Sequence, residues 1–229
     1  DQATGTPVVF ESGIVDNYTA TVFDSNANRI VVFYEDHGNG DYGTAVVGTV
    51  TGTSISFGTP VVFNSAITLS ISAAFDSNAG KVVVSYRDSG NSSRGTSLVG
   101  TVSGTSISFG SEAVFNSGST EFTASVFDTN NNKIVISYRD SGNSGYGTAV
   151  VGTLSGTSIS FGSETVFASS AVREVVSTFD SSSNKIVSFY RNEGSLNAGT
   201  VIVGTVSGTS ISFGATSLLG VEARNPAIT

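Results

Sequence analysis

The sequence predicts an all-β fold built from four copies of one structural unit. A Gly-Thr-Ser-Ile-Ser-Phe segment recurs every 52 residues and closes at Phe57, Phe109, Phe161 and Phe213. The same spacing separates four tyrosines, Tyr34, Tyr86, Tyr138 and Tyr190. A fixed period of this length is typical of repeat architectures, in which each repeat is one supersecondary unit.

Composition agrees with strands and turns. The chain has 229 residues, of which 27 are Gly and only 12% are charged, and Val, Ile and Phe dominate its apolar residues. Such a composition favours strands joined by short turns. The length suits one large all-β domain better than two independent ones.

One repeat, taken as Ile67 to Asn116, contains four predicted strands in order. Their ranges are Ser70–Phe75, Lys81–Arg87, Gly95–Val102 and Thr105–Phe115. Each strand combines β-branched or aromatic residues with flanking turn formers. The unit is therefore predicted to be a four-stranded antiparallel meander.

The turns between these strands are short. Asp76–Gly80 supplies Asx-turn formers and residues that tolerate positive φ, which favours a tight hairpin. A longer loop, Asp88–Arg94, joins the second and third strands, and Ser103-Gly104 turns between the third and fourth. All connections within the repeat are therefore local.

The pattern of apolar residues along the strands predicts a β-propeller. Val82–Val84 and Ile134–Ile136 are apolar on both faces, as expected for strands between two neighbouring sheets. Thr105–Phe109 alternates apolar and polar residues, which suits an edge strand. We expect a closed propeller of four blades, with five possible. The alternative is an open β-solenoid or a row of stacked sheets.

We expect residues 1–229 to form one propeller domain. Its repeats are placed at about 6–57, 58–109, 110–161 and 162–213, with 214–229 as a partial repeat or closing segment. Residues 1–21 and 209–229 correspond to the same part of the 52-residue repeat, so both cannot fill the same place in a closed ring. One end must therefore be displaced or add a strand, at Thr6–Phe10 or Val221–Thr229. Because Pro226 cannot donate to a central ladder, the C-terminal piece is expected to be irregular, at an edge or paired with another chain.

Charge and composition restrict the partners. A net charge of −8 with only ten basic residues argues against nucleic acid as a partner. No apolar stretch approaches the roughly 18 residues of a spanning helix, so membrane insertion is not expected. The chain lacks Met, which suggests that a leader or a larger parent has been removed. The acidic, Lys-poor composition favours an extracellular or surface-displayed protein.

Most catalytic constellations are missing. The chain has no Cys and a single histidine, His37, which is interpreted as an exposed loop residue. The Asp-x-Asn-x-Asn turns lack the later ligands of a calcium loop, so neither a metal nor another cofactor is expected. The protein is predicted not to be an enzyme. A glycoside hydrolase stays as an alternative, because Asp36, Asp88, Asp140 and Glu193 could meet across a ring.

The loop after the second strand is the candidate binding site. It combines Tyr, Arg, Asp and Asn, whose side chains can bind sugar hydroxyls and cover the apolar side of a sugar ring. Repeated weak sites on one scaffold gain avidity toward a repetitive glycan. The candidate residues are Asp36, Asn39, Tyr42, Arg87, Asp88, Asn91, Arg139, Asp140, Asn143, Tyr146, Arg191 and Asn192.

In size and blade count, the chain resembles the repeat-propeller lectins of the tachylectin-2 group and the bacterial PLL-type lectins. That likeness implies glycan binding between blades, but those lectins rely on Trp, which this chain lacks, so no binding residue is carried over. The amino-acid sequence of the repeat, as in Tyr138-Arg139-Asp140-Ser141-Gly142-Asn143, also resembles tandem repeats of surface or phage-associated proteins of unassigned function.

The same loop residues allow two interpretations, a structural role and a binding role. Arg87 and Arg139 can serve only to pair with Asp88, Asp140 or a neighbouring blade, and Gly90-Asn91 only to make the turn. The leading prediction is multivalent recognition of a glycan or cell-surface polysaccharide. The alternative is a structural or adhesive module that forms homo-oligomers through its terminal strands.

Overall fold

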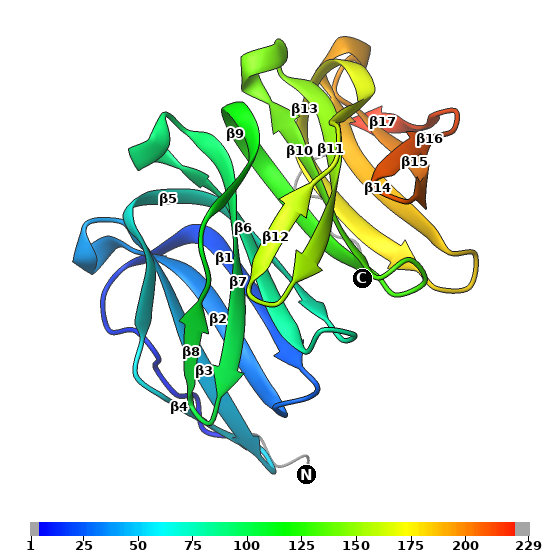
Figure 1. Cartoon of the computed structure of the whole chain (residues 1–229). Helices are drawn as coiled ribbons and strands as arrows, with labels where there is room; N and C mark the ends of the chain where they lie inside the picture. Colours follow the sequence, from blue (N-terminus) through cyan, green and yellow to red (C-terminus); the bar gives the residue numbers. More distant parts are fainter. Residues whose placement is uncertain (1–4, 223–229) are drawn as a thin grey trace.

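The computed structural model describes residues 5–222 and places them in 17 β-strands and four 3-10 helices. The strands belong to one antiparallel hydrogen-bonded network. In Figure 1 this network divides into sheets that follow one another in chain order, from blue to red. Within the described residues, no helix is long and apolar enough to cross a membrane.

The elements repeat in a fixed order. The first strands of the four repeats are β1 (Val15–Asp24), β5 (Val61–Asp76), β9 (Ala113–Asp128) and β13 (Thr165–Asp180). The second strands are β2 (Arg29–Asp36), β6 (Lys81–Asp88), β10 (Lys133–Asp140) and β14 (Lys185–Asn192). The third strands are β3 (Tyr42–Thr51), β7 (Arg94–Ser103), β11 (Tyr146–Ser155) and β15 (Ala198–Ser207).

Short elements complete each repeat. The short edge strands are β4 (Ser54–Phe57), β8 (Ser106–Phe109), β12 (Ser158–Phe161) and β16 (Ser210–Phe213), and the chain's last described strand is β17 (Ser217–Glu222). The 3-10 helices follow the second strands as η1 (His37–Asn39), η2 (Ser89–Asn91), η3 (Ser141–Asn143) and η4 (Glu193–Ser195).

The long strands connect the sheets. The first half of β5 pairs with β3, and its second half pairs with β6. β9 and β13 have the same double pairing. Each long strand therefore completes one sheet and begins the next, and we number the resulting sheets first to fourth along the chain.

The predicted hairpins are confirmed. Asp76 Oδ1 accepts hydrogen bonds from the backbone N–H groups of Asn78 (2.9 Å) and Ala79 (2.8 Å), and Gly80 has φ +62°. Ile107 on the edge strand is 4% exposed, as the alternation predicted. The predicted strand Thr105–Phe115 is divided, because residues 110–112 separate β8 from β9.

Apolar side chains fill the space between consecutive sheets. Val31 and Phe33 of the first sheet belong to one buried cluster with Val82 and Val84 of the second. At each of these junctions, a phenylalanine from the first half of a long strand packs against the tyrosine of the next sheet. The ring centroids lie 5.3 Å apart for Phe63–Tyr86, 5.2 Å for Phe115–Tyr138 and 5.2 Å for Phe167–Tyr190.

The predicted closed propeller of four or five blades is wrong. Among residues 5–222, β1 pairs with β2 alone and β17 with β15 alone, so the network has two free ends. Val203 of the fourth sheet is 42% exposed, whereas Val47, Val99 and Val151 at the same repeat position are at most 1% exposed. Sheets pack on their neighbours, and a repeat period does not fix how many sheets would close a ring. The fold is an open antiparallel sheet array.

The terminal segments agree with expectation in part, because the described C-terminal strand β17 lies at an edge of its sheet. Thr6–Phe10 is not a strand, although Phe10 packs against Tyr34 at 5.2 Å and Phe57 at 5.6 Å. The described C-terminal strand, β17, pairs with β15 inside its own chain. Most of the predicted strand Val221–Thr229, with Pro226, lies outside the described residues.

Candidate functional site

The turns after the second strands are held by acidic and amide side chains. Asp88 is 4% exposed, and its Oδ1 accepts hydrogen bonds from Gly90 N–H (3.0 Å) and Asn64 Nδ2 (3.3 Å). In the next repeats, Asp140 accepts from Asn143 N–H and Asn116 Nδ2, and Asn192 accepts from Gly194 N–H and Ser170 Oγ. The oxygens of Asp88, Asp140 and Asn192 therefore stabilise the turns.

The arginines of the same repeat position are held by glutamates. Arg87, Arg139 and Arg191 are the second-last residues of the second strands of three repeats, and their side chains are only 17–26% exposed. Arg87 Nη1 lies 3.4 Å from Glu121 Oε1, and Arg139 Nε lies 3.6 Å from Glu121 Oε2. Arg191 Nη1 lies 3.4 Å from Glu174 Oε1. Each of these cations is thus paired with a glutamate while its side chain stays partly exposed.

The ion pairs continue from sheet to sheet. Glu193 of η4 pairs with Arg139 of the third sheet at 3.8 Å and also with Arg173 of β13. An alternating series results, which we name the arginine–glutamate row: Arg87, Glu121, Arg139, Glu193 and Arg173. The row crosses the junctions between the second, third and fourth sheets.

The remaining predicted residues surround this row or its equivalent position on the first sheet. Asn39 and Asn143 are exposed, whereas Asp36, Tyr42 and Tyr146 are half-buried. Asn91 is also half-buried, and its Oδ1 accepts a hydrogen bond from Arg94 Nη1 at 3.3 Å. Glu35, which is 3% exposed, replaces the arginine on the first sheet. The structure therefore brings Arg87 and Arg139 together through Glu121, while Asp36, Asn39 and Tyr42 belong to a loop without that arginine.

Glu121 of the row was missed from the sequence, whereas Glu193 was named only as a carboxyl group of the hydrolase alternative. Glu121 occupies the repeat position of Leu69 and Arg173, so this position is not periodic in type. The 52-residue repeat therefore gives no signal for Glu121. The available signal was a charged residue inside a first strand composed mainly of small and apolar residues.

A strained bulge interrupts three of the first strands at one repeat position. Ser70, Phe122 and Glu174 have φ of 49°, 51° and 53°. Such a conformation costs a non-glycine residue about 1–3 kcal/mol and is an outlier for phenylalanine. Phe122 N–H donates to Ser70 Oγ at 3.1 Å, so two bulges are joined directly. In β9 and β13, the bulge separates Glu121 and Arg173 of the row from residues that line a hollow.

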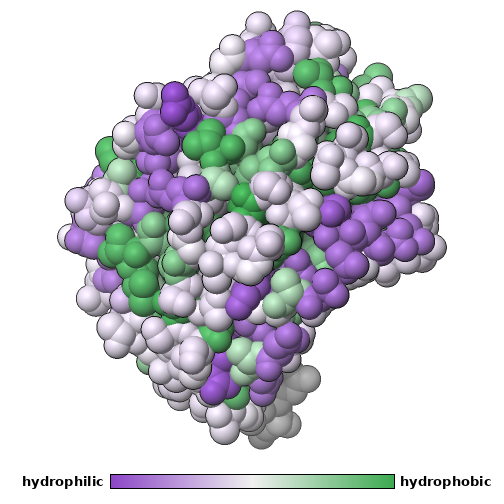
Figure 2. All heavy atoms as spheres, viewed as in Figure 1, coloured by the Kyte–Doolittle hydropathy of each residue, from purple (hydrophilic) through white to green (hydrophobic). Residues whose placement is uncertain are grey.

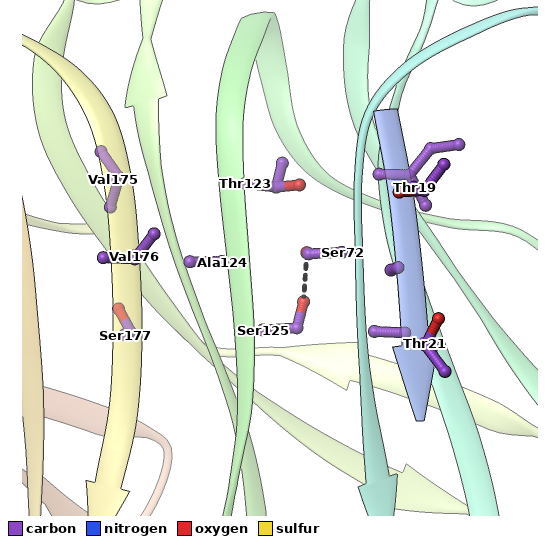
Figure 3. A pocket seen from close by; sticks show the side chains of 12 residues that line it. Thr19, Thr21, Ser72, Thr123, Ala124, Ser125, Val175, Val176 and Ser177 are labelled. Atoms are coloured by element: carbon purple, nitrogen blue, oxygen red, sulfur yellow. Dashed lines mark hydrogen bonds between the residues drawn. The ribbon is translucent and has the colours of Figure 1, made fainter. Parts of the chain in front are cut away.

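This hollow lies between the first strands of all four repeats and has a volume of about 290 Å³. It is lined by 19–21 of β1, 71–73 of β5, 123–125 of β9 and 175–177 of β13. Figure 3 shows the Ser72 and Ser125 hydroxyls, 2.8 Å apart, between Thr19, Thr21 and Ser177. The lining combines hydroxyl, methyl and isopropyl groups and carries no charge, so it suits water or an uncharged polar molecule rather than an ion.

The described part of the chain contains no group of three or more His, Cys, Asp or Glu side chains that could hold a metal ion. His37 is exposed, as predicted, and its Nδ1 lies 2.5 Å from Asp41 Oδ1. What the geometry defines is an open all-β repeat protein with a polar row across its sheet junctions.

Comparison with known proteins agrees with the all-β fold. No model of a protein family matches the chain, and no curated protein matches it either. Among solved structures, a triple arginine-to-alanine mutant of AofleA from Arthrobotrys oligospora is similar, with a TM-score of 0.50 and 11% sequence identity. The match covers 90% of this chain and 61% of that chain, so this chain spans less than two thirds of AofleA. At this identity the likeness concerns the fold alone.

Proposed function

We propose that the protein is a non-catalytic glycan-binding module whose sites lie at the sheet junctions, along the arginine–glutamate row. The observation that carries this proposal is the placement of Arg87 and Arg139. Each is held by Glu121 and stays partly exposed on the edge that also bears Asn143 and Tyr146.

The chemistry of the row suits sugar hydroxyls. A hydroxyl group both donates and accepts, and the row offers guanidinium donors beside carboxylate acceptors. Because Glu121 fixes both guanidinium groups, less side-chain entropy is lost when a ligand binds. The half-buried ring of Tyr146 can cover an apolar sugar face.

Repetition supports the same function. Arg87, Arg139 and Arg191 are equally spaced, 52 residues apart, and stand on three consecutive sheets. The AofleA crystal structure carries three arginine-to-alanine substitutions that are also equally spaced along its chain. Equally spaced weak sites favour a repetitive glycan, because binding at one site raises the effective concentration at the next.

The test is a glycan array with purified chain and with the double variant Arg87→Ala, Arg139→Ala. Binding is expected to fall at least about tenfold, since two charge-assisted donors are removed. Arg29→Ala is the matched control. Arg29 begins β2, at the opposite end of the second strand, and donates to Gly104 O at 2.9 Å. Its variant should bind like the wild type.

Circular dichroism must show that the variants are folded. Unchanged glycan binding by the folded double variant would place the sites elsewhere. A wild-type chain that binds no glycan on the array would overturn the proposed function.

A further inference from the structure

The fourth sheet ends the array with an apolar face that the other sheets bury. This rear face consists of Val187, Phe189, Val201 and Val203. The first three are half-buried, and Val203 is 42% exposed. At the same repeat positions, the three other sheets bury their side chains completely or almost completely against the next sheet. Figure 2 shows apolar atoms among polar ones over this end of the molecule, at the upper right.

The first sheet begins the array with the opposite face, which is also incompletely covered. This front face includes Ile30, Val32 and Ile55, which are half-buried, and Val50, which is 54% exposed. On the later sheets, the residues that match Ile30 are Val82, Ile134 and Ile186, and all three are 0% exposed. Within residues 5–222, the array therefore has two faces that no sheet covers, one at each end.

The three internal junctions show that a rear face fits a front face. Phe33 and Val47 of the first sheet's rear face pack with Val82, Val84 and Leu98 of the second sheet's front face. Phe189 occupies the repeat position of Phe33 and Val203 that of Val47, while Val32 occupies the position of Val84. A contact between the fourth sheet and a first sheet would repeat the chemistry of this internal junction.

A segment near the N-terminus, which forms no strand in its own chain, could supply the strand that such a contact between two copies needs. Gly5–Phe10 is identical in sequence to Gly58–Phe63. In the second copy of this sequence, Val61 pairs with Ala45 of the third strand β3, and Phe63 packs on Tyr86 and Phe109. Phe10 makes the equivalent contacts with Tyr34 and Phe57, although its segment is not a strand. The segment thus lies where the first half of a long strand would lie, but it has no third strand to pair with in its own chain.

We propose that two copies of the chain associate head to tail. The rear face of one copy packs on the front face of a second, and residues 5–14 of the second copy pair with β15 of the first in place of β17. The sequence Gly5–Phe10 matches the internal edge strands better than Gly214–Leu219, which lacks the phenylalanine. Such an interface joins different surfaces, so it can extend to further copies or close into a ring.

Sedimentation analysis of the full chain over a range of concentrations tests this association. The wild type is expected to show a mass of two copies or more that falls on dilution. Val203→Asp should weaken self-association about 100-fold, because it buries an unpaired carboxylate in the interface. Val114→Asp is the control, since Val114 is also 42% exposed but belongs to a repeat position that no junction covers.

A monomeric wild type overturns the proposal, and so does self-association that Val203→Asp leaves unchanged. A variant with Val8→Cys and Val201→Cys decides the geometry, because Val8 and Val201 match the paired Val61 and Ala45 and the chain has no other cysteine. Oxidation should link separate chains on a non-reducing gel. A disulfide within one chain, or none, would contradict the proposed exchange.

Discussion

Replacing Gly110 by alanine is expected to lower the free energy of unfolding by about 3 kcal/mol or more, because it overpacks a sheet junction. A Cβ at Gly110 would lie 1.9 Å from the carbonyl oxygen of Thr157, which lies in the turn between β11 and β12 of the third sheet. Since the obstacle is backbone, no side-chain rotation can relieve the clash. The second and third sheets would have to separate locally.

Gly214 provides the matched control for this prediction. It occupies the repeat position of Gly110, but among the described residues only Val203 O, at 3.8 Å, would lie within 4 Å of its Cβ. Alanine there should leave stability unchanged or raise it by up to about 1 kcal/mol, since it reduces the entropy of the unfolded chain.

Urea denaturation followed by circular dichroism measures both changes. It should be run on dilute protein, because self-association would add to the apparent stability. Equal effects of Gly110→Ala and Gly214→Ala would show that the close approach between the sheets is not what makes Gly110 necessary.

The strands could be predicted because their signals are local. The turn at Asp76–Gly80 is determined by Asx hydrogen bonds and a left-handed glycine, and both can be expected from residue type. The openness of the array could not be predicted in this way. Val203 and Val151 are the same residue at the same repeat position, and only the presence or absence of a following sheet distinguishes their exposure.

The candidate site was predictable only in part, for a related reason. Arg87 and Arg139 recur and were therefore found, whereas their partner Glu121 does not recur. Asp88 and Asp140 recur as well, but the structure uses them as hydrogen-bond acceptors within turns. A recurring residue can thus belong to the scaffold or to a site, and the hydrogen bonds distinguish the two.

The four recurring tyrosines give the fold a pronounced sensitivity to alkaline pH. Burial, followed by the charges of Glu11 and Asp36, raises the pKa of Tyr34 to about 12. Burial likewise raises the pKa of Tyr86 and of Tyr138, with further contributions from Glu112 and Glu164, whose carboxylates accept hydrogen bonds from these hydroxyls. Burial also raises the pKa of Tyr190. The folded chain therefore holds four phenolic protons more tightly than the unfolded chain does.

Stability should consequently be complete below about pH 10 and should fall steeply above it, because the unfolded tyrosines ionise first. Each tyrosine lowers the free energy of unfolding by about 1.4 kcal/mol per pH unit, until the pH reaches its own raised pKa. Four such groups acting together exhaust the roughly 5–15 kcal/mol of a typical domain within a few pH units, so cooperative unfolding is expected at about pH 11–12.

In an alkaline titration, the phenolate absorbance of the four recurring tyrosines, among the seven of the chain, should appear in the same step as the loss of far-ultraviolet circular dichroism. Tyr190→Phe keeps the ring that packs 5.2 Å from Phe167 but removes one titrating group, so the unfolding midpoint should move to higher pH. If the phenolate signal of all the tyrosines instead appeared near pH 10 while the dichroism of the strands persisted, the buried hydroxyls would not be what links this fold to pH.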